Sequence, residues 1–80
     1  MDMESSTFLE NVKKQFIDPD EIELTMSCDF REIDSYDSLT GMTIVVMLKD
    51  EYGIDISEAD YKSMKTIQEL FDYVLLKTKL

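Results

Sequence analysis

The sequence predicts an all-α fold, a four-helix bundle of three longer helices and one short helix with a long loop between helices one and two. Apolar residues recur at helical spacing in three segments, near 7–18, 38–52 and 66–77. Only two glycines and one proline are present, which favours long elements over many tight turns. We expect residues 1–80 to form a single domain with one small core, between about residues 7 and 77.

The first helix is expected over residues 7–18. Thr7 and Glu10 have the spacing of a capping box, and Pro19 forces Asp18 out of helical geometry. Apolar residues four apart, widened by two neighbours, form its stripe: Phe8, Leu9, Val12, Phe16 and Ile17.

Residues 19–37 are expected to form a long acidic connection, with Arg31 as its only base. A loop of this length needs anchoring, and spaced apolar side chains are expected to pin it across the helical core. The anchors are Ile22, Leu24, Met26, Phe30 and Ile33. Residues 21–26 are also compatible with a short helical turn. The alternating ligands of an EF-hand are not in register, so a weak divalent-ion site is the most that this loop suggests.

The next helix is expected over residues 38–52, with Gly53 as its left-handed cap. Residues 43–48 are prone to form a strand, but the length, the terminal glycine and the lack of a partner strand favour a helix, in which residues 44–48 are apolar on every face. A helix of this kind is either buried or offers one face to a partner. We expect the core face to comprise Leu39, Ile44, Val45 and Leu48. We expect Met42, Val46 and Met47 to remain partly exposed beside Ser38.

Two further helices follow an extended link at residues 54–56. Ser57 can cap a short helix over about residues 58–63, with Asp60 at the capping-box position. Thr66 and Glu69 form a second capping box at the start of the last helix. Its apolar stripe comprises Ile67, Leu70, Phe71, Val74 and Leu75.

Composition excludes several classes of function. Eighteen acids oppose eight bases, a net charge of −10, which disfavours binding to nucleic acid or to an anionic membrane and favours basic protein partners. Histidine is absent, which removes the commonest catalytic base and metal ligand, and Cys28 is alone. We therefore expect no catalysis and no dedicated metal site. No signal peptide or membrane-spanning run is visible, so the cytoplasm is the expected compartment.

The most informative residue is Ser38, which follows Asp37 at the expected start of the second helix. A hydroxyl there lies near unpaired backbone N–H groups and the positive end of the helix dipole. Because those groups would stabilise a phosphate ester, we interpret Ser38 as an attachment point for an anionic prosthetic group. Asp37 is expected to cap the helix.

The tripeptide Asp37-Ser38-Leu39 resembles the attachment motif of the acyl carrier protein family. The resemblance extends over about residues 7–77 and includes Tyr36 before the motif. It is carried further by the residues that follow the motif, which are Met42, Ile44, Val45, Leu48, Asp50, Glu51, Tyr52 and Gly53, and by residues 54–60 and 64–70. The motif lies at the start of helix two in an acidic four-helix pattern, a combination that is far more specific than the tripeptide alone.

This resemblance implies a covalent 4'-phosphopantetheine arm on Ser38, added by a phosphopantetheinyl transferase, with Asp37 and Leu39 beside it. The arm would carry acyl groups as thioesters in a fatty-acid, polyketide or related pathway. Partners would be acyl-loading and acyl-transferring enzymes with basic docking surfaces, and we expect a monomer. The expected partner-binding residues are Asp37, Leu39, Met42, Val46, Met47, Asp50 and Glu51.

Four positions depart from the family pattern. Thr43 and Lys49 stand where acids are usual, and Gly41 is unusual inside a helix, where it costs about 1 kcal/mol relative to alanine. Tyr36 stands where many relatives have a small residue, although some branches have an aromatic residue there. These departures suggest a dedicated carrier in a specialised pathway. The alternatives are an acidic adaptor protein that carries no prosthetic group and a small divalent-ion binder.

Overall fold

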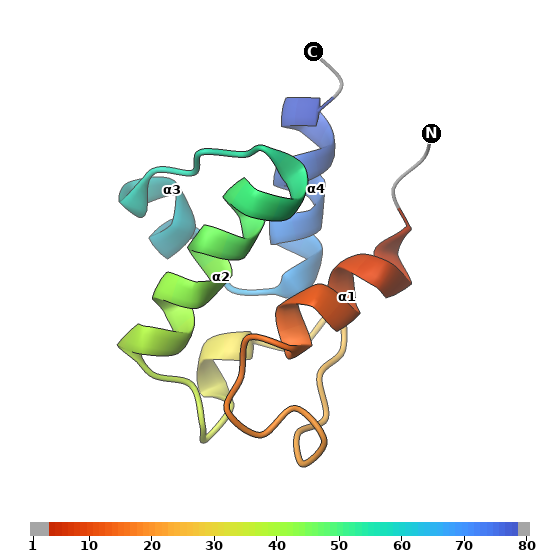
Figure 1. The fold of residues 1–80 in the computed structure, drawn as a ribbon, viewed down its shortest axis with the longest axis vertical. Coiled ribbons are helices and arrows are strands. Elements are labelled where there is room, and N and C mark those ends of the chain that lie inside the picture. Colours follow the sequence, from red (N-terminus) through yellow and green to blue (C-terminus); the bar gives the residue numbers. More distant parts are fainter. Residues whose placement is uncertain (1–3, 79–80) are drawn as a thin grey trace.

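Three longer helices pack pairwise around one core, and a short helix and a 3-10 turn complete the fold (Figure 1). The computed structural model describes residues 4–78. Its elements are α1 (Ser5–Lys13), η1 (Phe30–Glu32), α2 (Ser38–Tyr52), α3 (Glu58–Ser63) and α4 (Ile67–Thr78). The predicted all-α bundle is confirmed: in the described part of the chain, β-pairing is limited to one isolated bridge between Asp29 and Thr66.

Helix α1 ends five residues before the predicted boundary at residue 18. Beyond Lys13 the helix gives way to a tighter turn, in which the Gln15 N–H donates to the Val12 carbonyl at 3.0 Å and the Phe16 N–H donates to the Lys13 carbonyl at 3.1 Å. This turn places Phe16 in the core, 3% exposed, and leaves Ile17 87% exposed. The prediction that Ile17 widens the buried stripe is therefore wrong.

The start of α1 also differs from the prediction. The helix begins at Ser5, and its N-cap Glu4 accepts no side-chain hydrogen bond. Thr7 thus lies inside the helix, and the predicted capping box between Thr7 and Glu10 does not form. Because no side chain caps the start of α1, no capping motif in the sequence marks where this helix begins.

The caps of the later helices follow the sequence more closely. The Glu69 N–H donates to the Thr66 hydroxyl at 3.1 Å, and the Thr66 N–H donates to a Glu69 carboxylate oxygen at 3.1 Å, so the capping box of α4 is confirmed. At α3 only half of the box forms: the Asp60 N–H donates to the Ser57 hydroxyl at 3.1 Å. The Asp60 carboxylate accepts instead from the Tyr73 hydroxyl, which ties α3 to α4.

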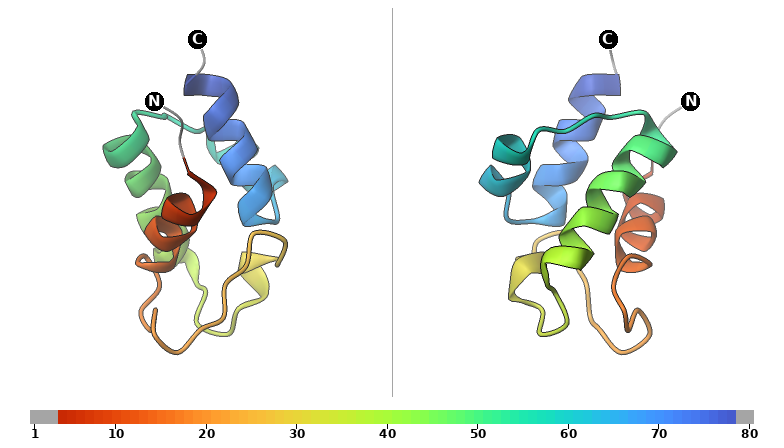
Figure 2. Two further views of the ribbon diagram at one scale, coloured as in Figure 1. Left: turned by 90° about the vertical axis from the view of Figure 1, so that its right-hand side faces the viewer. Right: turned by 60° about the vertical axis from the view of Figure 1, so that its left-hand side comes forward.

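The connection between α1 and α2 is pinned by apolar side chains, as predicted. Leu24 and Phe30 are buried, and Ile22, Met26 and Ile33 pack half-buried against the core. The two ribbon views of Figure 2 show this loop passing beneath the helices.

Backbone hydrogen bonds fix the same loop to the link between α3 and α4 and to the first turn of α4. The Gln68 N–H donates to the Met26 carbonyl at 2.8 Å, and the Phe30 N–H donates to the Lys65 carbonyl at 3.2 Å. The helical turn considered at residues 21–26 is absent, and the loop instead forms η1, whose N-cap Asp29 accepts from the Arg31 N–H.

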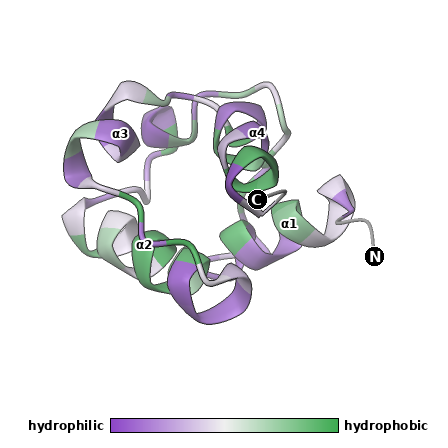
Figure 3. Ribbon diagram, turned by 90° about the horizontal axis from the view of Figure 1, so that it is seen from above, coloured by the Kyte–Doolittle hydropathy of each residue, from purple (hydrophilic) through white to green (hydrophobic). Residues whose placement is uncertain are grey.

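The core joins side chains from α1, α2, α4 and the loop, with Tyr61 of α3 and the residues Ile54, Ile56 and Met64 that flank α3. Hydrophobic segments gather on α1, α2 and α4, whereas α3 is mostly hydrophilic (Figure 3). The largest fully buried side chains are Phe8, Val12, Phe30, Ile44, Leu48, Ile67, Leu70 and Val74. Within residues 4–78, no helix is long and apolar enough to cross a bilayer.

Candidate functional site

The N-terminus of α2 is set by Asp37. Its backbone is extended, and its carboxylate accepts hydrogen bonds from the Thr40 N–H at 2.8 Å and from the Thr40 hydroxyl at 3.0 Å. These two bonds, the backbone one first, lower the pKa of the Asp37 carboxyl below its ordinary value of 3.8. Asp37 is therefore an ionised N-cap, as its position predicted.

Ser38 is the first residue of α2 and is exposed. Its hydroxyl lies at the positive end of the dipole of a helix of 15 residues. The Asp37 carboxylate is the nearest negative charge in the sequence, but it is engaged by Thr40. The site therefore has what a phosphate ester on a serine requires: an accessible hydroxyl and a helix terminus that stabilises an anion.

Three apolar side chains follow Ser38 along one exposed face of α2. Leu39 is 66% exposed, Met42 is 65% exposed and Val46 is 56% exposed. Their spacing of three and four residues places them on one side of a helix, and we call these three residues the apolar stripe. Leu39 thus lies with the expected partner-binding residues, and its assignment to the core face is wrong.

Met47 lies in the core and not on the exposed face. It is only 5% exposed, which corrects the prediction that it stays partly exposed. The core face of α2 comprises Thr40, Gly41, Ile44, Met47 and Leu48, and Val45 is only half-buried. Because residues 44–48 are all apolar, the sequence carried no periodic signal to distinguish Met47 from Val45 or Val46.

The apolar stripe borders a groove of about 500 Å³ between α1 and α2. Charged residues of both signs line the groove: Lys14 at the C-terminal end of α1, and Asp50 and Glu51 of α2. Asp50 and Glu51 are exposed, as the predicted docking surface requires. Lys49, which stands where the family usually has an acid, is not among the residues that line this groove. Its Nζ atom lies 3.8 Å from a carboxylate oxygen of Asp55 in the link to α3.

A second groove, of about 640 Å³, lies between α2 and α3, and Ser38 is among its lining residues. Its apolar lining comprises Met42, Val45, Val46 and Ile56. Tyr36 and Tyr61 line it as well, and their hydroxyl oxygens lie 3.0 Å apart. We call Tyr36 and Tyr61 the hydroxyl pair. Neither tyrosine was predicted to form part of the site.

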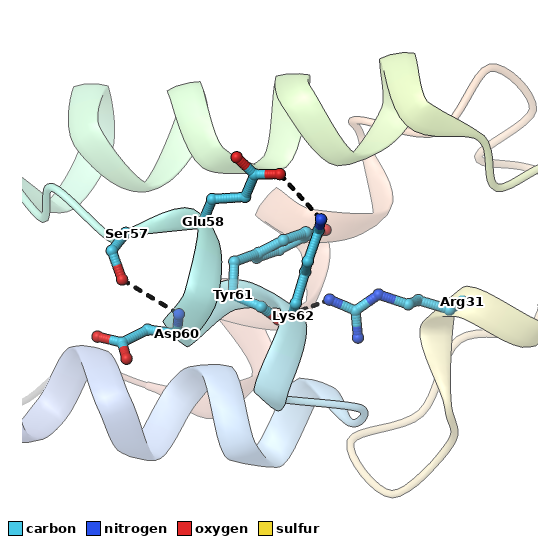
Figure 4. Close-up of polar contacts among 6 residues, drawn as sticks. All are labelled: Arg31, Ser57, Glu58, Asp60, Tyr61 and Lys62. Atoms are coloured by element: carbon cyan, nitrogen blue, oxygen red, sulfur yellow. Dashed lines mark hydrogen bonds and ion pairs between the residues drawn. The ribbon is translucent and has the colours of Figure 1, made fainter.

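Arg31 holds α3 in place beside this groove. Its guanidinium donates to the Tyr61 carbonyl at 2.6 Å and to the Met64 carbonyl, both at the C-terminal end of α3. It also stacks 4.8 Å from the centres of the Phe30 and Tyr61 rings. Figure 4 shows the side chain reaching from η1 to α3. The signal in the sequence was that Arg31 is the only base in an acidic loop.

Among residues 4–78, no three His, Cys, Asp or Glu side chains come together as a group that could hold a metal ion. The acidic residues of the loop are instead dispersed over its surface.

Comparison with known proteins identifies the family over nearly the whole chain. The family profile of the phosphopantetheine attachment site matches residues 7–74. An acyl carrier protein of Thermosynechococcus vestitus is 27% identical over 77 residues, which cover 90% of this chain and 93% of that protein. The polyketide-8 synthase acyl carrier protein 2 of Streptomyces avermitilis is 38% identical over 64 residues, 80% of this chain and 71% of that protein. No solved structure shows a significant match.

Proposed function

Because the chain belongs to the acyl carrier protein family, whose domain is a phosphopantetheine attachment site, we propose that Ser38 is the residue that bears its 4'-phosphopantetheine arm. Members of this family carry acyl groups and are not catalysts. We propose that this chain likewise has no catalytic activity and holds its cargo as a thioester at the end of the arm. A flexible arm of this kind gives the cargo a high effective concentration at each partner enzyme.

One observation supports Ser38 above all: it is an exposed serine at the first position of α2, directly after an ionised capping aspartate. The hydroxyl needs no base of its own, because a phosphopantetheinyl transferase activates it. The phosphodiester that results is an anion at a helix N-terminus, where it is stabilised. Asp37 would keep the helix start ordered while the transferase approaches.

The docking surface that we propose surrounds Ser38. It combines the apolar stripe of Leu39, Met42 and Val46 with three exposed acids of α2 and its cap, Asp37, Asp50 and Glu51. A partner that fits it has an apolar centre and a basic rim. The net charge of −10 would speed the approach of such enzymes at low salt.

We further propose that the pathway is a specialised fatty-acid, polyketide or related one. Thr43 and Lys49 remove two acids from the face that a general carrier would present. Thr43 in this chain serves the fold, since its hydroxyl donates to the Thr40 carbonyl at 2.8 Å. The similar proteins include both a plain acyl carrier protein and a polyketide synthase carrier.

The test is incubation with coenzyme A and several phosphopantetheinyl transferases, followed by measurement of the intact mass. We expect a gain of one phosphopantetheinyl group. Ser38→Ala should abolish the gain, and Ser27→Ala, at an exposed serine of the loop, should retain it. If no transferase modifies the chain, an acidic adaptor that docks through its apolar stripe and carries no arm becomes the better explanation.

A further inference from the structure

The groove between α2 and α3 is apolar on its α2 side and polar where the hydroxyl pair lies. Met42, Val45 and Val46 line it from α2, and Tyr36 and Tyr61 add two phenol groups. Since Ser38 borders this groove, an acyl group carried on an arm at Ser38 can fold back into it. What the groove selects then depends on the chemistry of the two hydroxyls.

One of the two O–H protons of the hydroxyl pair is free to be donated to a further acceptor. Tyr36 and Tyr61 together have two O–H protons, and one of them is used in the 3.0 Å bond between the two oxygens. Among residues 4–78 neither hydroxyl makes a hydrogen bond to any other protein group. The second proton is therefore available to an acceptor that enters the groove. Burial raises the pKa of the Tyr61 hydroxyl, so it remains a neutral donor.

The surroundings hold the pair in position. Gly41 leaves room for it, since a Cβ atom there would lie 2.6 Å from the Tyr36 hydroxyl oxygen. Arg31 fixes the backbone and ring of Tyr61 from the other side. A glycine inside a helix is unfavourable, and here its absent side chain is what gives the Tyr36 hydroxyl its place.

Two cations line the groove, and both are already engaged: the Arg31 guanidinium donates to the Tyr61 and Met64 carbonyls, and Lys62 pairs with an acid. Lys62 lies 2.9 Å from the Glu58 carboxylate, and Figure 4 shows the two side chains meeting along α3. A negatively charged cargo would have to compete with Glu58 for this lysine. A neutral oxygen that accepts from a phenol meets no such competition.

We infer that the groove selects acyl groups with a carbonyl or hydroxyl oxygen along the chain over fully saturated ones, and that Tyr36 and Tyr61 determine this specificity. A saturated chain would fill the apolar part of the groove but leave the spare donor without an acceptor, and an oxygenated chain would satisfy both. This inference rests on the proposed function, because it takes the cargo to be tethered at Ser38.

The test attaches the cargo chemically, so that it does not depend on a transferase. In a Ser38→Cys, Cys28→Ser variant, the single thiol is alkylated with pantetheine-like arms that end in acyl groups of equal length. One acyl group is saturated, and the others carry a single keto oxygen at successive positions. The melting temperature of each conjugate is then compared with that of the saturated conjugate.

We expect one keto position to raise the melting temperature above that of the saturated conjugate by about 4 °C, the shift that one net hydrogen bond produces in a domain of this size. Either tyrosine alone retains a donor, so the decisive variant is the double replacement Tyr36→Phe, Tyr61→Phe, in which this difference should vanish. Tyr73→Phe, which removes a hydroxyl that bonds to Asp60 outside the groove, should leave the difference intact.

The inference is overturned if no keto conjugate melts at a higher temperature than the saturated conjugate. It is also overturned if the difference in melting temperature survives in the double variant. A second measurement does not depend on any tyrosine variant. In the stabilised keto conjugate, nuclear Overhauser effects should be observed between the methylene protons next to the keto group and the ring protons of Tyr36 or Tyr61. Their absence also overturns the inference. Failure of transferase loading would instead refute the proposed function and leave this test of the groove intact.

Discussion

The Tyr36 hydroxyl oxygen lies 2.6 Å from the position that a Cβ atom on Gly41 would occupy. The two residues are five apart in sequence, one before the N-cap of α2 and one inside the helix. Tyr36 also packs against Phe16 and Phe30, with ring centres 6.2 Å and 5.7 Å away, so it has limited freedom to withdraw. The identity of residue 41 is therefore coupled to that of residue 36.

This coupling predicts that alanine at position 41 acts in opposite directions in two backgrounds. In the parent chain Gly41→Ala should destabilise the fold by about 1 kcal/mol, because overpacking outweighs the gain in helix propensity. In a Tyr36→Phe background the nearest remaining ring atom would be at 3.5 Å, an ordinary contact. There the same change should stabilise the fold by up to about 1 kcal/mol.

Urea denaturation of the four proteins in this double-mutant cycle measures the coupling. Additive effects would show that the Tyr36 hydroxyl moves aside freely. They would also weaken the assignment of Gly41 as the residue that makes room for it.

Arg31→Lys should destabilise the fold although it keeps the charge. The planar guanidinium donates to two carbonyls at the end of α3 and stacks on two rings, and a lysine cannot do all four. We expect a loss of about 1–2 kcal/mol in the free energy of unfolding, measured by urea denaturation. Lys62→Met, at an exposed base of α3, is the control and should leave the denaturation midpoint nearly unchanged. Equal effects of the two variants would contradict this role of Arg31.

Neighbouring residues of α2 should differ sharply in their tolerance of alanine. Met47 is 5% exposed, so Met47→Ala should cost about 2–5 kcal/mol. Val46 is 56% exposed, so Val46→Ala should change the free energy of unfolding by less than about 0.5 kcal/mol. Chemical denaturation measures both. A small loss for Met47→Ala would restore the prediction that its side chain faces outward.

The Val46→Ala variant also tests partner binding separately from stability, because its fold should be nearly unchanged. Val46→Ala should weaken binding to a transferase or an acyl-transferring enzyme, because Val46 belongs to the apolar stripe. Binding can be measured by titration calorimetry on the folded variant. Undiminished affinity would exclude Val46 from the docking surface.

Asp37 should make stability depend on pH in the acid range. Its pKa is lower in the folded state than its ordinary value of 3.8, so its contribution is complete at neutral pH. The contribution is lost as the pH falls through the lowered folded-state pKa. In Asp37→Asn, which keeps an acceptor for the Thr40 N–H but has no charge, this dependence should be missing.

The measurement is the melting temperature of both proteins from neutral pH down to about pH 3. Their difference should stay constant above about pH 5 and shrink below about pH 4. Asp20→Asn, which removes one exposed acid of the loop, controls for the change in net charge. A difference that does not vary with pH would contradict the role of an ionised cap.

Much of the site was predictable because its signals are local. The Thr66–Glu69 capping box and the left-handed Gly53, with φ of 69°, depend on residues a few positions apart. The position of Ser38 at the start of α2 is of the same kind. In each case the side chain that shapes the backbone lies within one helical turn of the feature that it forms.

Tertiary packing decided the features that link distant parts of the chain. Which of Val45, Val46 and Met47 faces inward depends on the rotation of α2 against α1 and α4, and a uniformly apolar run does not encode that rotation. The early end of α1 follows from the burial of Phe16. Tyr36 and Tyr61 are 25 residues apart, and only the folding of α3 against α2 brings their hydroxyls together.

The sequence by itself thus determined where the arm that we propose would be attached, because a cap, a serine and a helix start are neighbours along the chain. Only the tertiary structure decided what surrounds that arm, since a groove is made of side chains from elements that meet after folding. The physical reason is range: backbone capping acts over three or four residues, whereas burial depends on every element that packs against a side chain.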